Sequence, residues 1–230
     1  MSTARSPRVI LFDIDGTLVD CGGAGRRSMR EAFAAEVGAP EALDGVRFGG
    51  MTDLGIVRAG LTKLALEMND ALTTALLDRY LGFLREALRT STAYRVLEGA
   101  RDAIRAAHGP GRAVGLGTGN IRRGATLKLA RGELHELFDF GGFGCDAEGR
   151  DQVLRRGAER GAARLGVSLD ACEVLIVGDT PRDIEAAHAI GADCLAVATG
   201  GASIDELATA RPRYLVPSLA DPEALALLAR

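Results

Sequence analysis

Short apolar segments that alternate with helical stretches constrain the fold of this chain most strongly. The apolar segments predict buried β-strands at Arg8–Asp13, Ala113–Thr118, Val174–Asp179, Cys194–Ala198 and Tyr214–Val216. The helical stretches are Gly99–His108, Ile121–Ala130, Asp151–Leu165, Pro181–Ile190, Ile204–Ala208 and Pro222–Ala229. Because this alternation is typical of parallel pairing, we predict an α/β fold with helices on both faces of a parallel sheet. Ligands of such sheets bind at the carboxyl ends of the strands.

The stretch from residue 21 to residue 94 interrupts this alternation. It contains no clear strand and three helical patterns, at Ala24–Val37, Asp53–Leu66 and Asp70–Leu88. Leucine and tyrosine side chains recur at helical spacing in the last of these, as expected for packing within a small bundle. We therefore predict a core of residues 1–20 and 95–230 and an all-helical cap of residues 21–94, which would cover the end of the first strand.

Composition and charge limit the kinds of molecule that this chain is expected to bind. The chain has 230 residues, of which 47% are hydrophobic, and a formal net charge of -3, so nothing indicates binding to nucleic acid or to an acidic membrane surface. It has no apolar run of signal or membrane-spanning length, and we expect a cytoplasmic protein. Four widely spaced cysteines without a CxxC pair are expected to be free thiols: Cys21, Cys145, Cys172 and Cys194.

The segment from Asp13 to Leu18 reads Asp-Ile-Asp-Gly-Thr-Leu and carries the clearest chemical signal. Two carboxylates two residues apart, where a strand opens into a loop, can converge on one hard metal ion and one substrate. One can attack while the other transfers a proton. Similar segments occur in ordinary turns and in calcium-binding loops, but a calcium loop needs further oxygen ligands downstream. The pattern therefore favours catalysis by Asp13 and Asp15.

Two further strand ends carry polar residues. Gly115–Asn120 follows an apolar run and precedes a helix, so its hydroxyl and backbone amides can bind phosphate, although Gly-Thr-Gly also forms simple turns. The strand that ends at Gly178 would deliver Asp179 to the same sheet edge as Asp13. Asp183 lies in the first turn of the next helix. Taken alone, Asp179 and Asp183 could be a capping residue and a helix-start acid.

These three segments resemble motifs I, II and IV of the haloacid dehalogenase superfamily, with Thr118 as the motif II residue. The resemblance covers essentially the whole chain and is greatest to phosphatases similar to phosphoglycolate phosphatase and β-phosphoglucomutase. The helical insertion is similar to the C1-type cap of that family. The resemblance implies a Rossmann-like, doubly wound parallel sheet. It also implies a Mg²⁺-dependent phosphatase that hydrolyses a small phosphorylated metabolite through an aspartyl-phosphate intermediate.

The resemblance also implies roles for the acidic residues. Asp13 would attack phosphorus, and Asp15 would protonate the leaving oxygen and then activate water. Mg²⁺ would be held by the Asp13 carboxylate, the main-chain carbonyl of Asp15 and the carboxylate of Asp179. Asp183 would support these ligands without binding the metal itself.

The remaining ligands of the phosphoryl group are less well defined by the resemblance. Thr118 and the amide of Gly119 or Asn120 would hold phosphoryl oxygens. The family also has a motif III lysine, and the corresponding segment here contains Arg150 and no lysine. Lys128 is the rival, but it lies about 10 Å along its predicted helix at ~1.5 Å per residue, which favours Arg150. Either residue could also be an ordinary surface charge.

The loop Phe48–Asp53 is the only conspicuous polar and glycine-rich loop of the expected cap. Related caps carry a Gly-x-Thr-Asp segment at this place, which implies that Thr52 and Asp53 face the active site. Either residue could equally cap the helix that follows. Arg47, just before the loop, is a candidate for binding a substrate carboxylate or a second phosphate.

Two other functions remain compatible with these motifs. A phosphomutase of the β-phosphoglucomutase type would keep every motif and differ in how well its cap excludes water. A non-catalytic binding protein on the same scaffold is the second alternative, since the motif III lysine is missing. Asp15 argues against dehalogenation and against phosphonate cleavage. Phosphoglycolate, a sugar phosphate and a nucleoside monophosphate all remain candidate substrates, and we expect a monomer or small homo-oligomer.

Overall fold

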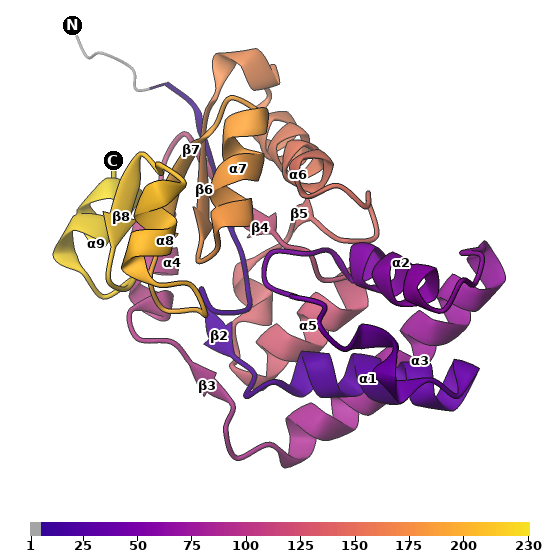
Figure 1. Ribbon diagram of the computed structural model, residues 1–230. Helices are drawn as coiled ribbons and strands as arrows, with labels where there is room; N and C mark the ends of the chain where they lie inside the picture. The colour runs from indigo at the N-terminus through magenta and orange to yellow at the C-terminus, as the bar shows by residue number, and fades with distance from the viewer. Residues whose placement is uncertain (1–5) are drawn as a thin grey trace, which may run out of the picture.

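The computed structural model describes residues 6–230, and a parallel sheet forms its centre (Figure 1). Its six strands follow the order β5-β4-β1-β6-β7-β8. They are β1 (Arg8–Phe12), β4 (Arg112–Gly117), β5 (Gly141–Gly142), β6 (Glu173–Gly178), β7 (Asp193–Val197) and β8 (Tyr214–Val216). The chain moves outward from β1 in one direction and then in the other, so the sheet is doubly wound. The predicted Rossmann-like α/β fold is confirmed.

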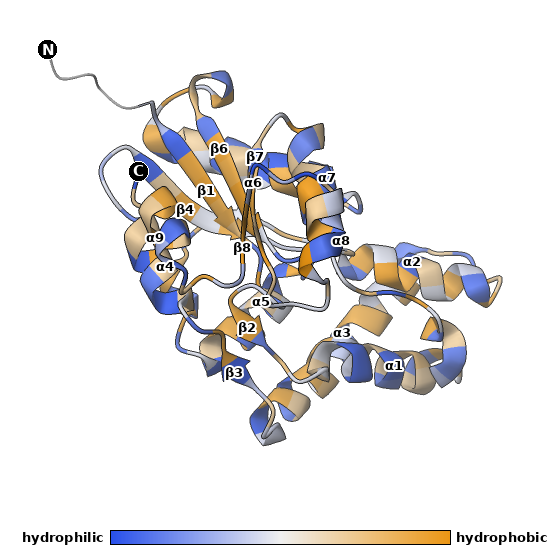
Figure 2. Ribbon diagram, turned by 60° about the vertical axis from the view of Figure 1, so that its left-hand side comes forward, coloured by the Kyte–Doolittle hydropathy of each residue, from blue (hydrophilic) through white to orange (hydrophobic). Residues whose placement is uncertain are grey.

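Alternate side chains of β1 pack against helices on opposite faces of the sheet. Val9 and Leu11 join a buried apolar cluster with the helices α6, α7 and α8, whereas Ile10 and Phe12 join one with α4, α5 and α9. All four side chains are fully buried, as expected for a central parallel strand covered on both faces. Figure 2 shows the hydrophobic strands between these helices. The helices are α4 (Ala100–Ala107), α5 (Arg122–Arg131), α6 (Arg150–Leu165), α7 (Pro181–Ala189), α8 (Ile204–Thr209) and α9 (Pro222–Leu228).

The segment between the first and second strands of the core is helical. It contains α1 (Ala24–Val37), a 3-10 helix η1 (Pro40–Leu43), α2 (Asp53–Lys63) and α3 (Asp70–Thr90). These helices lie together beyond the carboxyl ends of the strands in both ribbon views (Figures 1 and 2). A short antiparallel pair, β2 (Val19–Asp20) and β3 (Arg95–Val96), joins the chain where it leaves and re-enters the core.

Some elements differ from the sequence-based expectations. The strand pair β2–β3 and the short strand β5 were not predicted. The strand β5 consists of two glycines, which give no apolar pattern. The helix expected to reach Leu66 ends at Lys63, because the backbone turns into the left-handed region at Ala65. Residues 1–5, which were expected to belong to the core, lie outside the described residues. No helix within residues 6–230 is both long and apolar enough to cross a membrane.

Candidate active site

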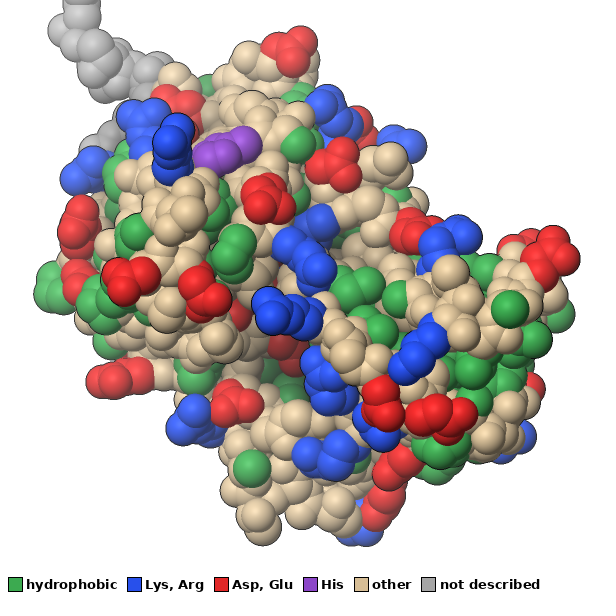
Figure 3. Space-filling view, in the orientation of Figure 1, with side chains coloured by type: hydrophobic (Ala, Val, Ile, Leu, Met, Phe, Trp, Pro, Cys, Tyr) green, Lys and Arg blue, Asp and Glu red, His purple; other side chains and the backbone are tan. Residues whose placement is uncertain are grey.

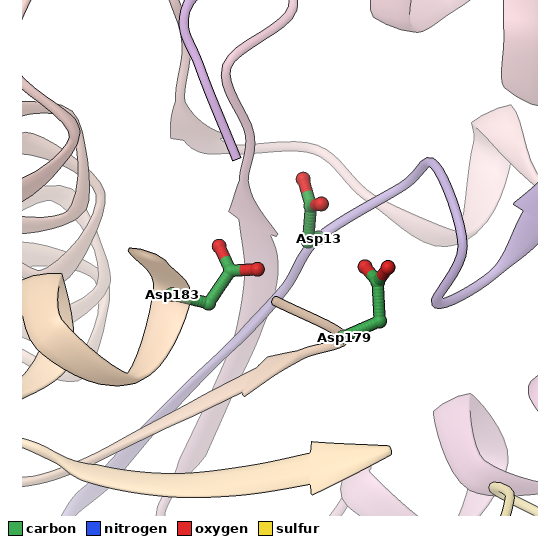
Figure 4. A group of neighbouring side chains, drawn as sticks. All are labelled: Asp13, Asp179 and Asp183. Atoms are coloured by element: carbon green, nitrogen blue, oxygen red, sulfur yellow. The ribbon is translucent and has the colours of Figure 1, made fainter. Parts of the chain in front are cut away.

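Three buried aspartates meet at the carboxyl edge of the sheet (Figure 4). Asp13 follows β1 and Asp179 follows β6; these strands pair in parallel with Phe12 opposite Val177, so both acids emerge at one edge. Asp183 lies in the first turn of α7. The candidate ligand oxygens of the three acids lie within 4.8 Å of one another. The meeting of Asp13 and Asp179 follows from the strand ends that the sequence predicted, and the first turn of α7 adds Asp183.

Arg150 partly offsets the negative charge of this cluster. Its Nη2 lies 3.0 Å from Asp13 Oδ1 and 2.6 Å from Asp183 Oδ1, and it also donates a hydrogen bond to the Gly117 carbonyl. Burial raises the pKa of Asp13 to about 6, with Arg150 opposing that shift. The side chain of Arg150 is only 8% exposed, so it is not an ordinary surface charge.

Asp179 has no such cationic partner within residues 6–230. Burial raises its pKa well above the usual carboxyl value, and the negative charges of Asp183 and Asp13 raise it further. Its Oδ1 accepts a hydrogen bond from the Thr17 hydroxyl at 3.1 Å. Its Oδ2 fits against two glycines: a Cβ atom would stand 2.3 Å away at Gly16 and 1.6 Å away at Gly200. A buried carboxylate left in this state calls for a cation.

The donor set fits Mg²⁺. Carboxylate oxygens are hard ligands, and Asp13 and Asp179 both line the cleft. Asp183 has both oxygens engaged: Oδ1 accepts hydrogen bonds from Arg150, and Oδ2 accepts them from the Thr180 backbone and hydroxyl. It is therefore arranged to hold Arg150 and the start of α7 rather than to bind a metal directly.

Lys128 lies beside the second aspartate of the first motif. Its Nζ is 2.6 Å from Asp15 Oδ2 and 2.6 Å from Asn120 Oδ1, while Asn120 Nδ2 donates to the same Asp15 oxygen at 2.8 Å. Burial alone would raise the pKa of Asp15, but the positive charge of Lys128 and these hydrogen bonds outweigh it and lower the pKa. Asp15 is therefore held as a carboxylate.

The estimate that Lys128 would be too far from the site was wrong. The helix α5 begins at Arg122, and helical side chains lean toward the N-terminus of their helix. The long lysine side chain therefore reaches back to Asn120, and it is only 5% exposed. Both cations considered from the sequence lie at the site, each beside a different aspartate.

The turn after β4 lies between these two cations. Gly119 and Asn120 line the cleft, whereas Thr118 is fully buried beneath it. The Thr118 hydroxyl accepts hydrogen bonds from the Asn120 side chain at 2.9 Å and from its backbone amide at 3.3 Å. Thr118 therefore shapes the turn that presents Gly119 and Asn120.

The loop before α2 reaches this turn from the helical segment. Thr52 caps α2, accepting a hydrogen bond from the Gly55 amide, and its hydroxyl donates to the Glu148 carbonyl at 2.8 Å. Asp53 is buried and lines the cleft, and its carboxylate accepts a hydrogen bond from the Ile121 amide at 2.8 Å. Capping of α2 is therefore performed by Thr52, while Asp53 contacts the core.

A cleft of about 870 Å³ separates the helical segment from the core. Apart from the residues above, its lining includes Arg26, Arg47 and Arg182, and Figure 3 shows basic side chains gathered on this face. Arg182 donates hydrogen bonds to the carbonyls of Arg47 and Gly49 and so joins α7 to the loop before α2.

Sequence reasoning missed some of these residues. Thr17, which donates to Asp179, belongs to the Asp-Ile-Asp-Gly-Thr segment and could have been found there. Tyr80 lines the cleft, although its helical spacing indicated only core packing. Nothing in the local sequence distinguishes Arg182 or Gly200 from other surface and loop residues.

The chain belongs to the haloacid dehalogenase-like hydrolases, because the model of that family matches residues 7–191. This assignment agrees with the doubly wound sheet and with the aspartates at its edge. No curated protein is similar enough in sequence to count as a relative.

Solved structures of hydrolases and of a mutase share this fold. A hydrolase from Pseudomonas syringae is 21% identical, with a TM-score of 0.69 over 94% of this chain and 95% of that one. A predicted phosphoglycolate phosphatase from Haemophilus somnus is 18% identical, with a TM-score of 0.66 and coverage of 98% and 100%. A β-phosphoglucomutase from Clostridium difficile is 14% identical, with a TM-score of 0.69 and coverage of 98% and 97%.

Proposed function

We propose that this hydrolase is a Mg²⁺-dependent phosphatase that cleaves a small phosphate monoester through an aspartyl phosphate on Asp13. The observation that carries the proposal is the difference between the two aspartates of the first motif. Asp13 lies in the acidic cluster beside Arg150, and Asp15 lies two residues away beside Lys128. This difference supports attack by one carboxylate and proton transfer by the other.

In the first half of the reaction, an oxygen of Asp13 attacks phosphorus and the bond from phosphorus to the ester oxygen breaks. Asp15 must be protonated at this stage, against the tendency that Lys128 imposes, and it gives that proton to the leaving oxygen. In the second half, Asp15 takes a proton from water, which attacks the phosphoryl group and releases Asp13 and inorganic phosphate. The pairing with Lys128 lowers the pKa of Asp15 and so favours its role as the base in this second half.

The phosphoryl oxygens would be bound by groups that surround Asp13. The backbone amides of Gly119 and Asn120 and the guanidinium of Arg150 are the candidate donors, with Thr118 holding the turn in place. Asp13, Asp179 and the Asp15 carbonyl would hold Mg²⁺, supported by Asp183. Mg²⁺ would supply positive charge to the phosphoryl oxygens as their charge redistributes in the transition state.

We also propose that residues 21–94 act as a cap over the core of residues 1–20 and 95–230. The cleft lies between the two, and α2 contacts the core through Thr52 and Asp53. A cleft of about 870 Å³ covered in this way suits a small metabolite rather than a folded protein substrate.

The test is phosphate release from a panel of small phosphate esters, with and without Mg²⁺, by the unaltered protein and by Asp13→Asn. We expect Mg²⁺-dependent release that Asp13→Asn abolishes. Asp102→Asn is the matched control, because Asp102 is an exposed acid on α4 that pairs with Arg105. Release that survives Asp13→Asn, or no release from any ester, would refute the proposal. Isomerisation of a sugar phosphate without phosphate release would identify a mutase instead.

A further inference from the structure

The start of α2 makes two hydrogen bonds to the turn that follows β4. The Asp53 amide donates to the Gly119 carbonyl at 2.8 Å, and Asp53 Oδ2 accepts from the Ile121 amide at 2.8 Å. The Asp53 residue is 6% exposed, so both bonds are shielded from water. They connect residues about 70 positions apart in the chain, across the cleft.

The helix α5 lacks a capping side chain of its own. Its N-cap residue is Ile121, which cannot accept a hydrogen bond through its side chain, and its first turn contains no acid. Arg122 and Arg123 instead place positive charge at the helix end where negative charge is favourable. Asp53 therefore supplies, from α2, the carboxylate that the sequence of α5 does not provide.

The contact is close as well as polar. A Cβ atom at Gly119 would stand 2.1 Å from the Met51 carbonyl oxygen, so only glycine allows this approach. A second contact lies nearby, where Thr52 donates to the Glu148 carbonyl and Arg58 forms an ion pair with the Glu148 carboxylate at 2.6 Å. The start of α2 thus touches both core segments that carry the proposed phosphate donors, the turn at residues 119–120 and the segment before Arg150.

We propose that Asp53 is a positioning residue that completes the phosphate-binding turn when the cap is docked. Its carboxylate caps α5 and fixes the Gly119–Asn120 turn, so that the backbone amides of the turn are aligned only while α2 contacts the core. The inference rests on the proposed phosphatase function. It implies that substrate binding and ordering of the turn are coupled, as in closure by induced fit.

Two substitutions at one position test this role through activity. Asp53→Ala removes the acceptor and should lower kcat/KM by about 10-fold to 100-fold, the range expected for losing a hydrogen bond to a charged group. Asp53→Asn keeps an oxygen acceptor of the same shape and should restore most of that loss. Asp70→Ala is the matched control, because Asp70 is an exposed acid in the first turn of another helix of the same segment, α3.

Hydrogen exchange at the Ile121 amide gives a second readout that does not require turnover. It would be followed in the full chain with Mg²⁺ and inorganic phosphate present. We expect protection in the unaltered protein, Asp53→Asn and Asp70→Ala, and faster exchange in Asp53→Ala. If Asp53→Ala does not fold, Asp53→Ser replaces it, because serine is tolerated in a first helical turn but is too short to keep the contact.

The inference is overturned if loss of the Asp53 carboxylate changes neither Ile121 exchange nor kcat/KM. It is also overturned if Asp53→Asn is as impaired as Asp53→Ala, since a retained acceptor should rescue a capping role. Failure of the proposed function looks different: no ester would be hydrolysed by any variant, while exchange at Ile121 would still decide whether Asp53 caps α5.

Discussion

Asp13 and Asp15 lie two residues apart, yet the fold gives them different surroundings. Asp13 shares Arg150 with Asp183, and burial raises its pKa to about 6. Asp15 faces Lys128, which lowers its pKa. Separate environments for neighbouring acids allow one to act as nucleophile and the other as proton carrier. At the scale of single residues, the proposed mechanism depends on this separation.

Replacing Lys128 should change the pH dependence of the reaction. Because Lys128 lowers the pKa of Asp15, which acts as the base in hydrolysis of the aspartyl phosphate, Lys128→Met should raise that pKa and move the acidic limb of the kcat profile to higher pH. Activity at pH 6 should fall more than activity at pH 8. The measurement is a pH–rate profile on one phosphate ester, with Lys63→Met, an exposed lysine of α2, as the control. An unchanged acidic limb would argue against the pairing of Lys128 with Asp15.

Removing the charge of Asp179 should stabilise the metal-free protein. Its folded-state pKa is raised, so its ionisation destabilises the fold as pH rises above the unfolded value. In EDTA at pH 8, Asp179→Asn should therefore melt at a higher temperature than the unaltered protein.

Added Mg²⁺ should instead stabilise the unaltered protein more than Asp179→Asn. At a Mg²⁺ concentration of 100 times Kd, the free energy of unfolding of the unaltered protein should rise by about 2.7 kcal/mol, and its melting temperature should rise accordingly. The melting temperature of Asp179→Asn should rise far less. Thermal melts over a Mg²⁺ titration measure both effects. Equal shifts in the two proteins would mean that Asp179 is not a ligand.

At the scale of elements, α6 approaches the sheet through glycine. A Cβ atom at Gly157 would stand 2.8 Å from the Gly142 amide nitrogen and 2.9 Å from Leu11 Cδ1. Such contacts bring the helix backbone close to β5 and to the strand that carries Asp13. They also explain how β5, which consists of two glycines, fits beneath α6 without side chains of its own.

Two glycine-to-alanine substitutions should act in opposite directions. Gly157→Ala should destabilise the protein by about 1–2 kcal/mol, since overpacking costs more than the gain in helix propensity. Gly82→Ala should stabilise it by about 0.5–1 kcal/mol, because Gly82 is exposed within α3 and a Cβ atom there meets nothing within 4 Å. Urea unfolding measures both. Equal effects at the two positions would contradict the close packing of α6.

At the scale of the whole molecule, the cleft is bordered by cations from both of its sides. Arg26 stacks on the Phe48 ring at 4.1 Å, and Arg182 binds backbone carbonyls of the loop before α2. Within residues 6–230, no carboxylate lies in ion-pair range of either guanidinium or of that of Arg47. Guanidinium groups that line a cleft without an ion-pair partner favour a substrate with a second anionic group.

Arg47 should therefore distinguish between phosphate esters. Arg47→Ala should raise KM about 10-fold for an ester that bears a carboxylate, the loss expected for one charge-assisted hydrogen bond, and leave its uncharged amide analogue unaffected. Arg79→Ala is the control, since Arg79 is an exposed arginine of α3 that pairs with Glu36. Equal effects on the two esters would show that Arg47 does not bind a second anion.

The sequence by itself determined the α/β class, the helical insertion and the placement of Asp13 and Asp179 at one edge of the sheet. These features depend on local periodicity and on where a strand ends, and both are determined by residues that are close together in the sequence. Only the tertiary structure decided which cation faces which aspartate, and that Asp53 reaches the Ile121 amide. Such contacts depend on side-chain direction and on how distant elements dock, and neither is encoded in the spacing along the chain.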